Sequence, residues 1–144
     1  MIIKKRYMNG KNRGYLYSAI GRQIARCHFY ENYKAGIIVA CDEGKLHSVS
    51  GIAKTIITRD DADYRPLTTS LHEVVIPFTN GSCLRIIKPF KNKRNCQFND
   101  ILYDNSLDNE TINGFIKPMY TAYEENFNQK DFMMRFTGFD LCEY

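Results

Sequence analysis

The sequence contains no tryptophan, no cysteine pair spaced as CxxC, and no apolar run near the roughly 20 residues of a membrane-spanning helix. Its first residues carry charge, but the apolar segment of a signal peptide does not follow them. The five cysteines are an odd number without the close ligand pairs of structural zinc sites. We therefore expect a cytoplasmic protein with reduced thiols and no membrane association; the alternative is a zinc site of Cys27, His28 and Cys41.

The composition is that of a globular protein, and the length predicts one domain over residues 1–144. Charge is distributed unevenly along the chain. Residues 1–34 carry eight lysines and arginines against one acid, and residues 85–94 carry five bases and no acid. Residues 95–144 hold nine acids and three bases. If the fold brings basic segments together, they predict a surface for phosphate or a nucleic-acid backbone.

Strands and helices alternate in the predicted order. Glycine, asparagine and basic residues predict a polar loop at residues 9–14. Apolar spacing predicts helices at residues 15–33 and 46–58. Apolar runs and an Asn-Gly turn predict strands at residues 37–41, 73–77, 83–87 and 100–104. Less regular segments predict strands at residues 2–3 and 132–136 and a loop at residues 59–72. They also predict helices at residues 110–116 and 119–127. The fold class is α/β: a mainly parallel sheet flanked by helices, with a β-hairpin insertion.

Two segments are more specific than the rest. One is the hairpin Asn80-Gly81-Ser82 with the apolar strand after it, and the other runs from Lys93 through Arg94 to the strand that ends at Asp104-Asn105. With the strand, loop and helix order before them, these segments resemble the ATPase core of phage terminase large subunits. That family is a branch of the P-loop nucleotidases, and the resemblance spans roughly residues 2–120. It implies a P-loop nucleotidase-like fold in a phage protein.

The departures from that family bear on function. Its phosphate loop reads G-x-x-x-x-G-K-[ST], and alignment on Gly14 places Tyr15 at the lysine and Leu16 at the hydroxyl residue. The resemblance implies that Asp104 is the magnesium-associated acid, but Asn105 stands where the family keeps the glutamate that activates water. We therefore expect no efficient ATP hydrolysis and no catalytic residues. The remaining candidates for phosphate or nucleotide binding are Gly10, Lys11, Arg13, Gly14, Tyr15 and Arg94, with Asp104 as the metal candidate.

The expected function is that of a catalytically degenerate, phage-type ATPase-like domain that binds a phosphate-bearing ligand or nucleic acid. The sequence does not continue into the nuclease domain of terminases, so a packaging motor is not expected. One alternative is a small phage-encoded inhibitor that binds a host nuclease or defence complex, with the acidic residues 95–144 imitating nucleic acid. The other is a residual ATPase, acting on ATP with magnesium, whose partner supplies the missing lysine or glutamate. Either would act in the host cytoplasm.

Overall fold

The structure, a computed structural model, describes residues 11–40, 43–59, 68–69, 73–88, 96–123, 132, 134–139 and 141. The helical elements in these ranges are α2 (Lys11–Phe29), α3 (Glu43–Arg59), α4 (Asn109–Thr111), the π-helix η2 (Ile112–Ile116) and the 3₁₀-helix η3 (Lys117–Met119). The strands are β1 (Lys34–Ile38), β2 (Thr68–Thr69), β3 (Glu73–Pro77), β4 (Cys83–Ile87), β5 (Asp100–Asp104) and β6 (Phe136–Phe139).

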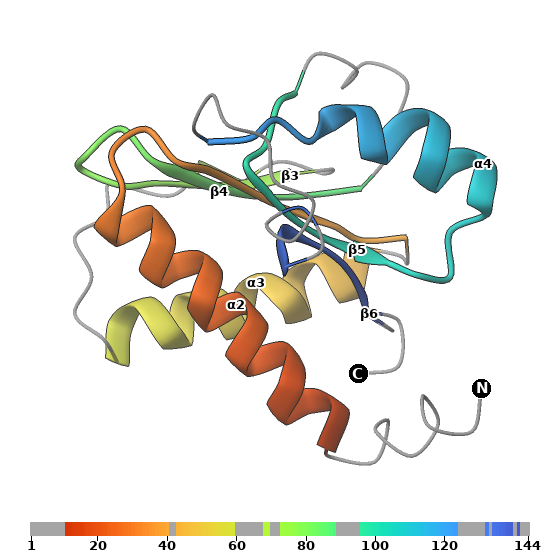
Figure 1. Cartoon of the computed structure of the whole chain (residues 1–144). Helices are drawn as coiled ribbons and strands as arrows, with labels where there is room; N and C mark the ends of the chain where they lie inside the picture. Colours follow the sequence, from red (N-terminus) through yellow and green to blue (C-terminus); the bar gives the residue numbers. More distant parts are fainter. Residues whose placement is uncertain are drawn as a thin grey trace.

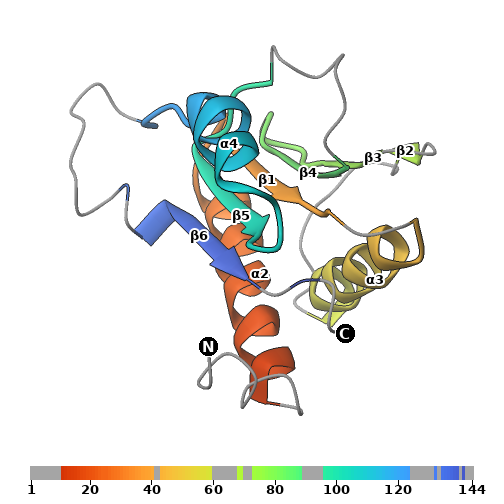
Figure 2. The same cartoon turned by 90° about the vertical axis from the view of Figure 1, so that its right-hand side faces the viewer.

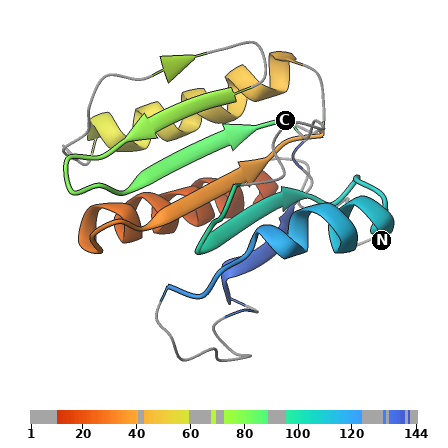
Figure 3. The same cartoon turned by 90° about the horizontal axis from the view of Figure 1, so that it is seen from above.

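The six strands form one sheet in the order β2-β3-β4-β1-β5-β6. β4, β1, β5 and β6 run parallel, whereas β3 is antiparallel to both of its neighbours. Because β3 and β4 are consecutive, they form a hairpin at one side of the parallel part. Figure 3 shows this hairpin beside the parallel strands. The coarse prediction of an α/β fold with a mainly parallel sheet and a β-hairpin is confirmed.

Helices cover the two faces of the sheet unequally. Figure 1 shows α2 and α3 together under one face, and α4 over the other. The larger apolar core lies on the first face, where α2 contributes Leu16, Ile20 and Ile24, spaced for one side of a helix. A smaller core on the second face groups Ile38, Ile101, Phe98, Ile116 and Met119. Figure 2 shows α4 over β5 and β1, with no described helix over β3 and β4 on that side.

Several boundaries differ from the sequence-based expectation. α2 begins at Lys11 and ends at Phe29, so the loop expected over residues 9–14 is wrong for Lys11–Gly14. Helix propagation costs little once a turn has formed, and the glycine and asparagine residues do not stop it. β1 starts three residues earlier than the apolar run because Lys34–Gly36 pair with β4 on one side, and Ala35 and Gly36 also pair with β5 on the other.

The last third of the chain was predicted least well. Tyr120 pairs with Phe98 in an isolated β-bridge, so the helix expected over residues 119–127 is wrong at its start. Pro118 lies in η3, where no backbone amide is needed. The final strand falls at Phe136–Phe139 instead of residues 132–136, and β2 lies inside the expected loop at residues 59–72. The strand expected at residues 2–3 lies outside the described residues.

None of the helices in the described ranges combines the length and the low charge that crossing a bilayer would require.

Candidate functional site

Asp104, the last residue of β5, is fully buried at the carboxyl edge of the parallel strands. One carboxylate oxygen accepts a hydrogen bond from the backbone amide of Ala40, 3.3 Å away and two residues beyond the end of β1. The other oxygen accepts hydrogen bonds from the backbone amide and the hydroxyl of Ser106, at 3.1 and 2.8 Å. The side chain of Asp104 therefore ties the end of β5 to the end of β1.

The chain leaves the ends of β1 and β5 in opposite directions. α3 follows β1 and leads to β2, β3 and β4 on one side, whereas α4 follows β5 and the chain reaches β6 on the other. In open α/β sheets, ligands bind outside the carboxyl ends of the strands where such connections diverge. The first turn of α3 begins at this edge, and the backbone amides at the start of a helix favour an anion. By topology this edge is a candidate ligand site.

The described side chains at this edge do not fit a magnesium–nucleotide centre. Both oxygens of Asp104 already accept hydrogen bonds from the protein. The backbone amide of Asn105 donates to the carbonyl of Phe139 at 2.9 Å, and its side-chain oxygen is buried without a hydrogen-bond partner in the described part of the chain. Within the described ranges, no three His, Cys, Asp or Glu side chains gather as metal ligands. We therefore assign no step of ATP hydrolysis to these residues.

The phosphate-loop candidates do not form a loop where the structure describes them. The backbone of Lys11, Arg13 and Gly14 belongs to the first turn of α2, so Gly14 lies inside a helix instead of ending a phosphate loop. Tyr15, aligned with the missing lysine, is 56% exposed. Gly10 and Arg94 lie outside the described residues, so their role in binding stays a prediction.

The Asn80-Gly81-Ser82 segment, which supported the resemblance, caps α2. The side-chain amide of Asn80 donates to the carbonyls of Cys27, His28 and Tyr30 at 2.9, 3.2 and 3.0 Å. The hydroxyl of Ser82 donates to the carbonyl of Tyr30 at 2.6 Å. These contacts satisfy carbonyls that a helix end leaves without partners. The motif therefore has a structural reason in this fold that does not depend on nucleotide binding.

A buried polar cluster at the opposite edge was missed from the sequence. Asp100, at the start of β5, forms an ion pair with Arg26 of α2 and accepts hydrogen bonds from Gln23 and Tyr33 at 3.3 and 3.2 Å. Burial raises the pKa of Asp100, and the charge of Arg26 opposes that rise. Arg135 donates to the hydroxyl of Tyr33 at 2.8 Å. Gln23 and Arg26 are three residues apart on one helix face, and that spacing was the available signal.

The burial of individual side chains bears on two of the alternatives, the imitation of nucleic acid by acidic residues and the zinc site. Asp100 and Asp104 are two of the nine acids in residues 95–144, and both are buried, so neither adds charge to a surface that imitates nucleic acid. Of the three zinc candidates, Cys27 is buried with its thiol 3.6 Å from the carbonyl of Cys83, whereas His28 is exposed. Cys41 lies outside the described residues.

The helices on the larger core form a basic layer. α2 and α3 pack side by side under the same face of the sheet. Their sequences contain seven lysines and arginines and one acid, Glu43, and one of the seven, Arg26, pairs with the buried Asp100. Arg22, Lys54 and Arg59 are exposed on them. On the other face, residues 108–119 carry two acids and one base, Lys117. We call α2 and α3, with these three exposed bases, the basic layer.

No protein-family model matches the chain, and neither a curated protein nor a solved structure shows significant similarity to it.

Proposed function

We propose that the protein binds the phosphate backbone of nucleic acid through the basic layer, on the scaffold of an α/β domain that does not hydrolyse ATP efficiently. The observation that carries the proposal is the packing of α2 beside α3, which brings the exposed bases Arg22, Lys54 and Arg59 to one side of the sheet. A surface of one charge sign attracts a polyanion and releases its counterions on contact.

Aromatic side chains on the same layer support this proposal. Tyr15 is 56% exposed on α2, and the guanidinium of Arg59 lies 5.8 Å from the ring centroid of Tyr17. Tyr17 is half-buried against the core, so Tyr15 is the ring on this layer that can stack on a nucleic-acid base, and every base offers a face for stacking. We therefore expect single-stranded nucleic acid to bind more tightly than a duplex of equal length.

The experiment is a titration of fluorescent single-stranded and duplex DNA at a series of salt concentrations. The logarithm of the binding constant should fall linearly with the logarithm of salt. Arg22→Gln and Lys54→Gln should each weaken binding to all sequences and lower the salt slope by about 1. The matched control is Lys117→Gln, an exposed base on the opposite face of the sheet, which should leave affinity and slope unchanged.

Two results would contradict the proposal. One is the absence of binding at low salt, and the other is an equal loss of affinity in Lys117→Gln and Arg22→Gln. Nucleotide binding is tested in a separate experiment. Calorimetric titration with ATP and magnesium tests the carboxyl edge near Asp104, and Arg22→Gln should not alter its result.

A further inference from the structure

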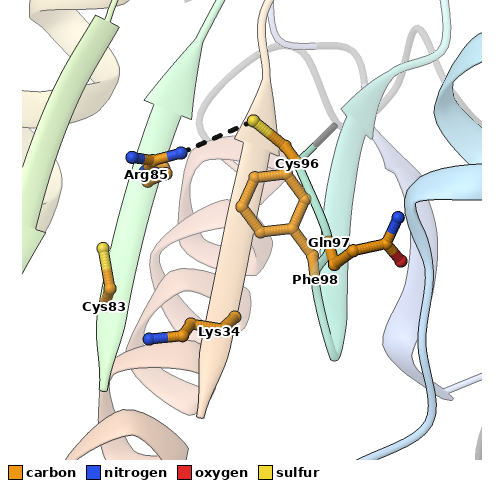
Figure 4. Close-up of a pocket in the computed structure, with 6 residues that line it drawn as sticks. All are labelled: Lys34, Cys83, Arg85, Cys96, Gln97 and Phe98. Carbon is orange, nitrogen blue, oxygen red and sulfur yellow. Dashed lines mark hydrogen bonds between the residues drawn. The ribbon is translucent and has the colours of Figure 1, made fainter. Parts of the chain in front are cut away.

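A pocket of about 330 Å³ lies on the face of the sheet opposite the basic layer. Lys34, Cys83, Arg85, Cys96, Gln97 and Phe98 line it. Figure 4 shows Arg85, Cys96 and Phe98 in front of β4 and β1, Gln97 beside β5, and α2 behind the sheet. α4 covers only the β5 and β1 part of this face, so no described helix fills the space over β4. The volume is at the lower end of the range for small-molecule sites.

The pairing of the strands places the polar side chains at the pocket. Lys34 of β1 stands opposite Cys83 of β4, and Gly36 stands opposite Arg85. Since side chains two residues apart on a strand share a face, both bases point to the same side. The ammonium of Lys34 donates to the carbonyl of Gly81 at 3.0 Å, which holds the charge at the rim.

An ion pair and a thiol fix the position of Arg85. Its Nε lies 3.2 Å from a carboxylate oxygen of Glu73, which is largely buried, and one of its terminal nitrogens lies 3.5 Å from the sulfur of Cys96. Among the described residues at the pocket, Lys34 and Arg85 together with Glu73 leave one net positive charge. A ligand with a single negative charge matches that balance, and a triphosphate does not.

Apolar and polarisable groups form the remaining wall. The ring of Phe98 lies over Gly36, so close that a Cβ on Gly36 would be 2.9 Å from it. Backbone bonds to Met119 and Thr121, both at 2.7 Å, hold Phe98 in place. Burial raises the pKa of the Cys83 thiol, and the charges of Arg85 and Lys34 oppose that rise. Thiols and an aromatic ring favour a flat apolar body.

From this arrangement we infer that the pocket binds a small aromatic monocarboxylate, with the carboxylate between Lys34 and Arg85 and the ring against Phe98 and the two thiols. The site is separate from the basic layer and does not depend on nucleic-acid binding.

Benzoate is the probe for the full chain, with benzamide as its neutral counterpart and inorganic phosphate as an anion without a ring. Binding is measured by calorimetry, and its place by the rate at which N-ethylmaleimide modifies Cys83, followed by peptide mass spectrometry. Benzoate should bind and slow the modification of Cys83, whereas benzamide and phosphate should do neither. Equal binding of benzamide, equal binding of phosphate, or no effect of benzoate on Cys83 would overturn the inference.

Variants on opposite faces of the sheet sharpen the test. Lys34→Gln, at an exposed position, should weaken benzoate binding by about tenfold, the loss expected for one charge-assisted hydrogen bond. Arg85→Gln alone would leave Glu73 buried without its partner, so it is combined with Glu73→Gln. That double variant should also lose binding. Lys54→Gln, on the basic layer, is the matched control and should bind benzoate as the parent does; an equal loss there would overturn the inference.

Discussion

The side-chain amide of Asn80, at the tip of the β3–β4 hairpin, donates a hydrogen bond to the carbonyl of Cys27 in the last turn of α2, at 2.9 Å. Two more carbonyls beyond Cys27 accept from the same nitrogen. The hairpin therefore caps the C-terminus of α2 from a segment more than fifty residues away in the sequence. The end of α2 is set by a tertiary contact.

Replacement of Asn80 tests this cap. Asn80→Ala removes the donor and should lower the free energy of unfolding by about 1–2 kcal/mol. Asn80→Asp should cost more than alanine, because a carboxylate cannot donate and adds negative charge at the negative end of the helix. Urea denaturation gives both values. Asn113→Ala, at an exposed position in η2, is the matched control and should change stability little. Equal stability of Asn80→Asp and the parent would contradict the cap.

The sequence placed the end of α2 too late, because the residues that end the helix are not marked by the apolar pattern. Apolar spacing alone ran the helix to residue 33. Asn32, however, has a φ of 56°, a left-handed conformation that stops a helix, and Tyr33 is fully buried just before β1. The sequence did predict β3, β4 and β5 at their observed bounds, because each is a short apolar segment bounded by turn residues or by an acid. For these three strands, the local pattern of apolar and turn residues is sufficient to predict the bounds.

The polar clusters depended on long-range pairing that one sequence does not show. The partners Arg26 and Asp100 are 74 residues apart, and Ala40 and Asp104 are 64 apart. Asp104 was singled out because the resemblance implies a magnesium-associated acid there. The structure places it at the end of β5, and its role as a metal ligand stays a prediction. The polar loop expected over residues 9–14, by contrast, is helical from Lys11 onward. The described contact beside Asp104 is the backbone amide of Ala40, two residues after the end of β1.

Gly36 and Gly51 should respond to alanine in opposite ways. A Cβ on Gly36 would meet the Phe98 ring at 2.9 Å, and the ring is buried and held by backbone bonds. Gly36→Ala should therefore lower the free energy of unfolding by about 1–3 kcal/mol. A Cβ on Gly51 in α3 would meet nothing within 4 Å, so Gly51→Ala should raise it by up to about 1 kcal/mol through helix propensity.

Thermal and urea denaturation of both glycine variants gives the comparison. Phe98→Leu should partly rescue Gly36→Ala, because a smaller side chain relieves the contact. A Gly36→Ala variant as stable as the parent would show that Phe98 does not pack against β1 as described.

Asp104→Asn separates a structural role from a catalytic one. The bonds from Ala40 and Ser106 go to different carboxylate oxygens, and an amide keeps only one of these as an acceptor, so one partly buried backbone donor loses its partner. We expect a loss of about 1–3 kcal/mol in the free energy of unfolding. Glu110→Gln, an exposed acid on α4, is the control and should change stability little.

The same variant should not change ATP turnover, because the parent protein is expected to have none above background. Turnover that is present in the parent and absent in Asp104→Asn would contradict the proposed loss of hydrolysis. It would favour the residual ATPase in its place.

Asp100 and Asp108 should give opposite dependences of stability on pH. Burial raises the pKa of Asp100 above its ordinary value of 3.8, so the folded chain binds this proton more tightly than the unfolded chain. Its contribution to stability is then fully present below that value and is lost as pH rises through the raised pKa. Hydrogen bonds from Thr111 lower the pKa of Asp108, so its contribution is present above the ordinary value and is lost as pH falls.

The measurement is urea denaturation of the parent, Asp100→Asn and Asp108→Asn over a pH series across the acidic range. The stability difference between the parent and Asp100→Asn should shrink or reverse as pH rises, because the asparagine does not titrate. The difference for Asp108→Asn should grow over the same series, which makes it the internal control. If both differences grow with pH, the ion pair with Arg26 outweighs the burial of Asp100, and the pKa of Asp100 is lowered instead of raised.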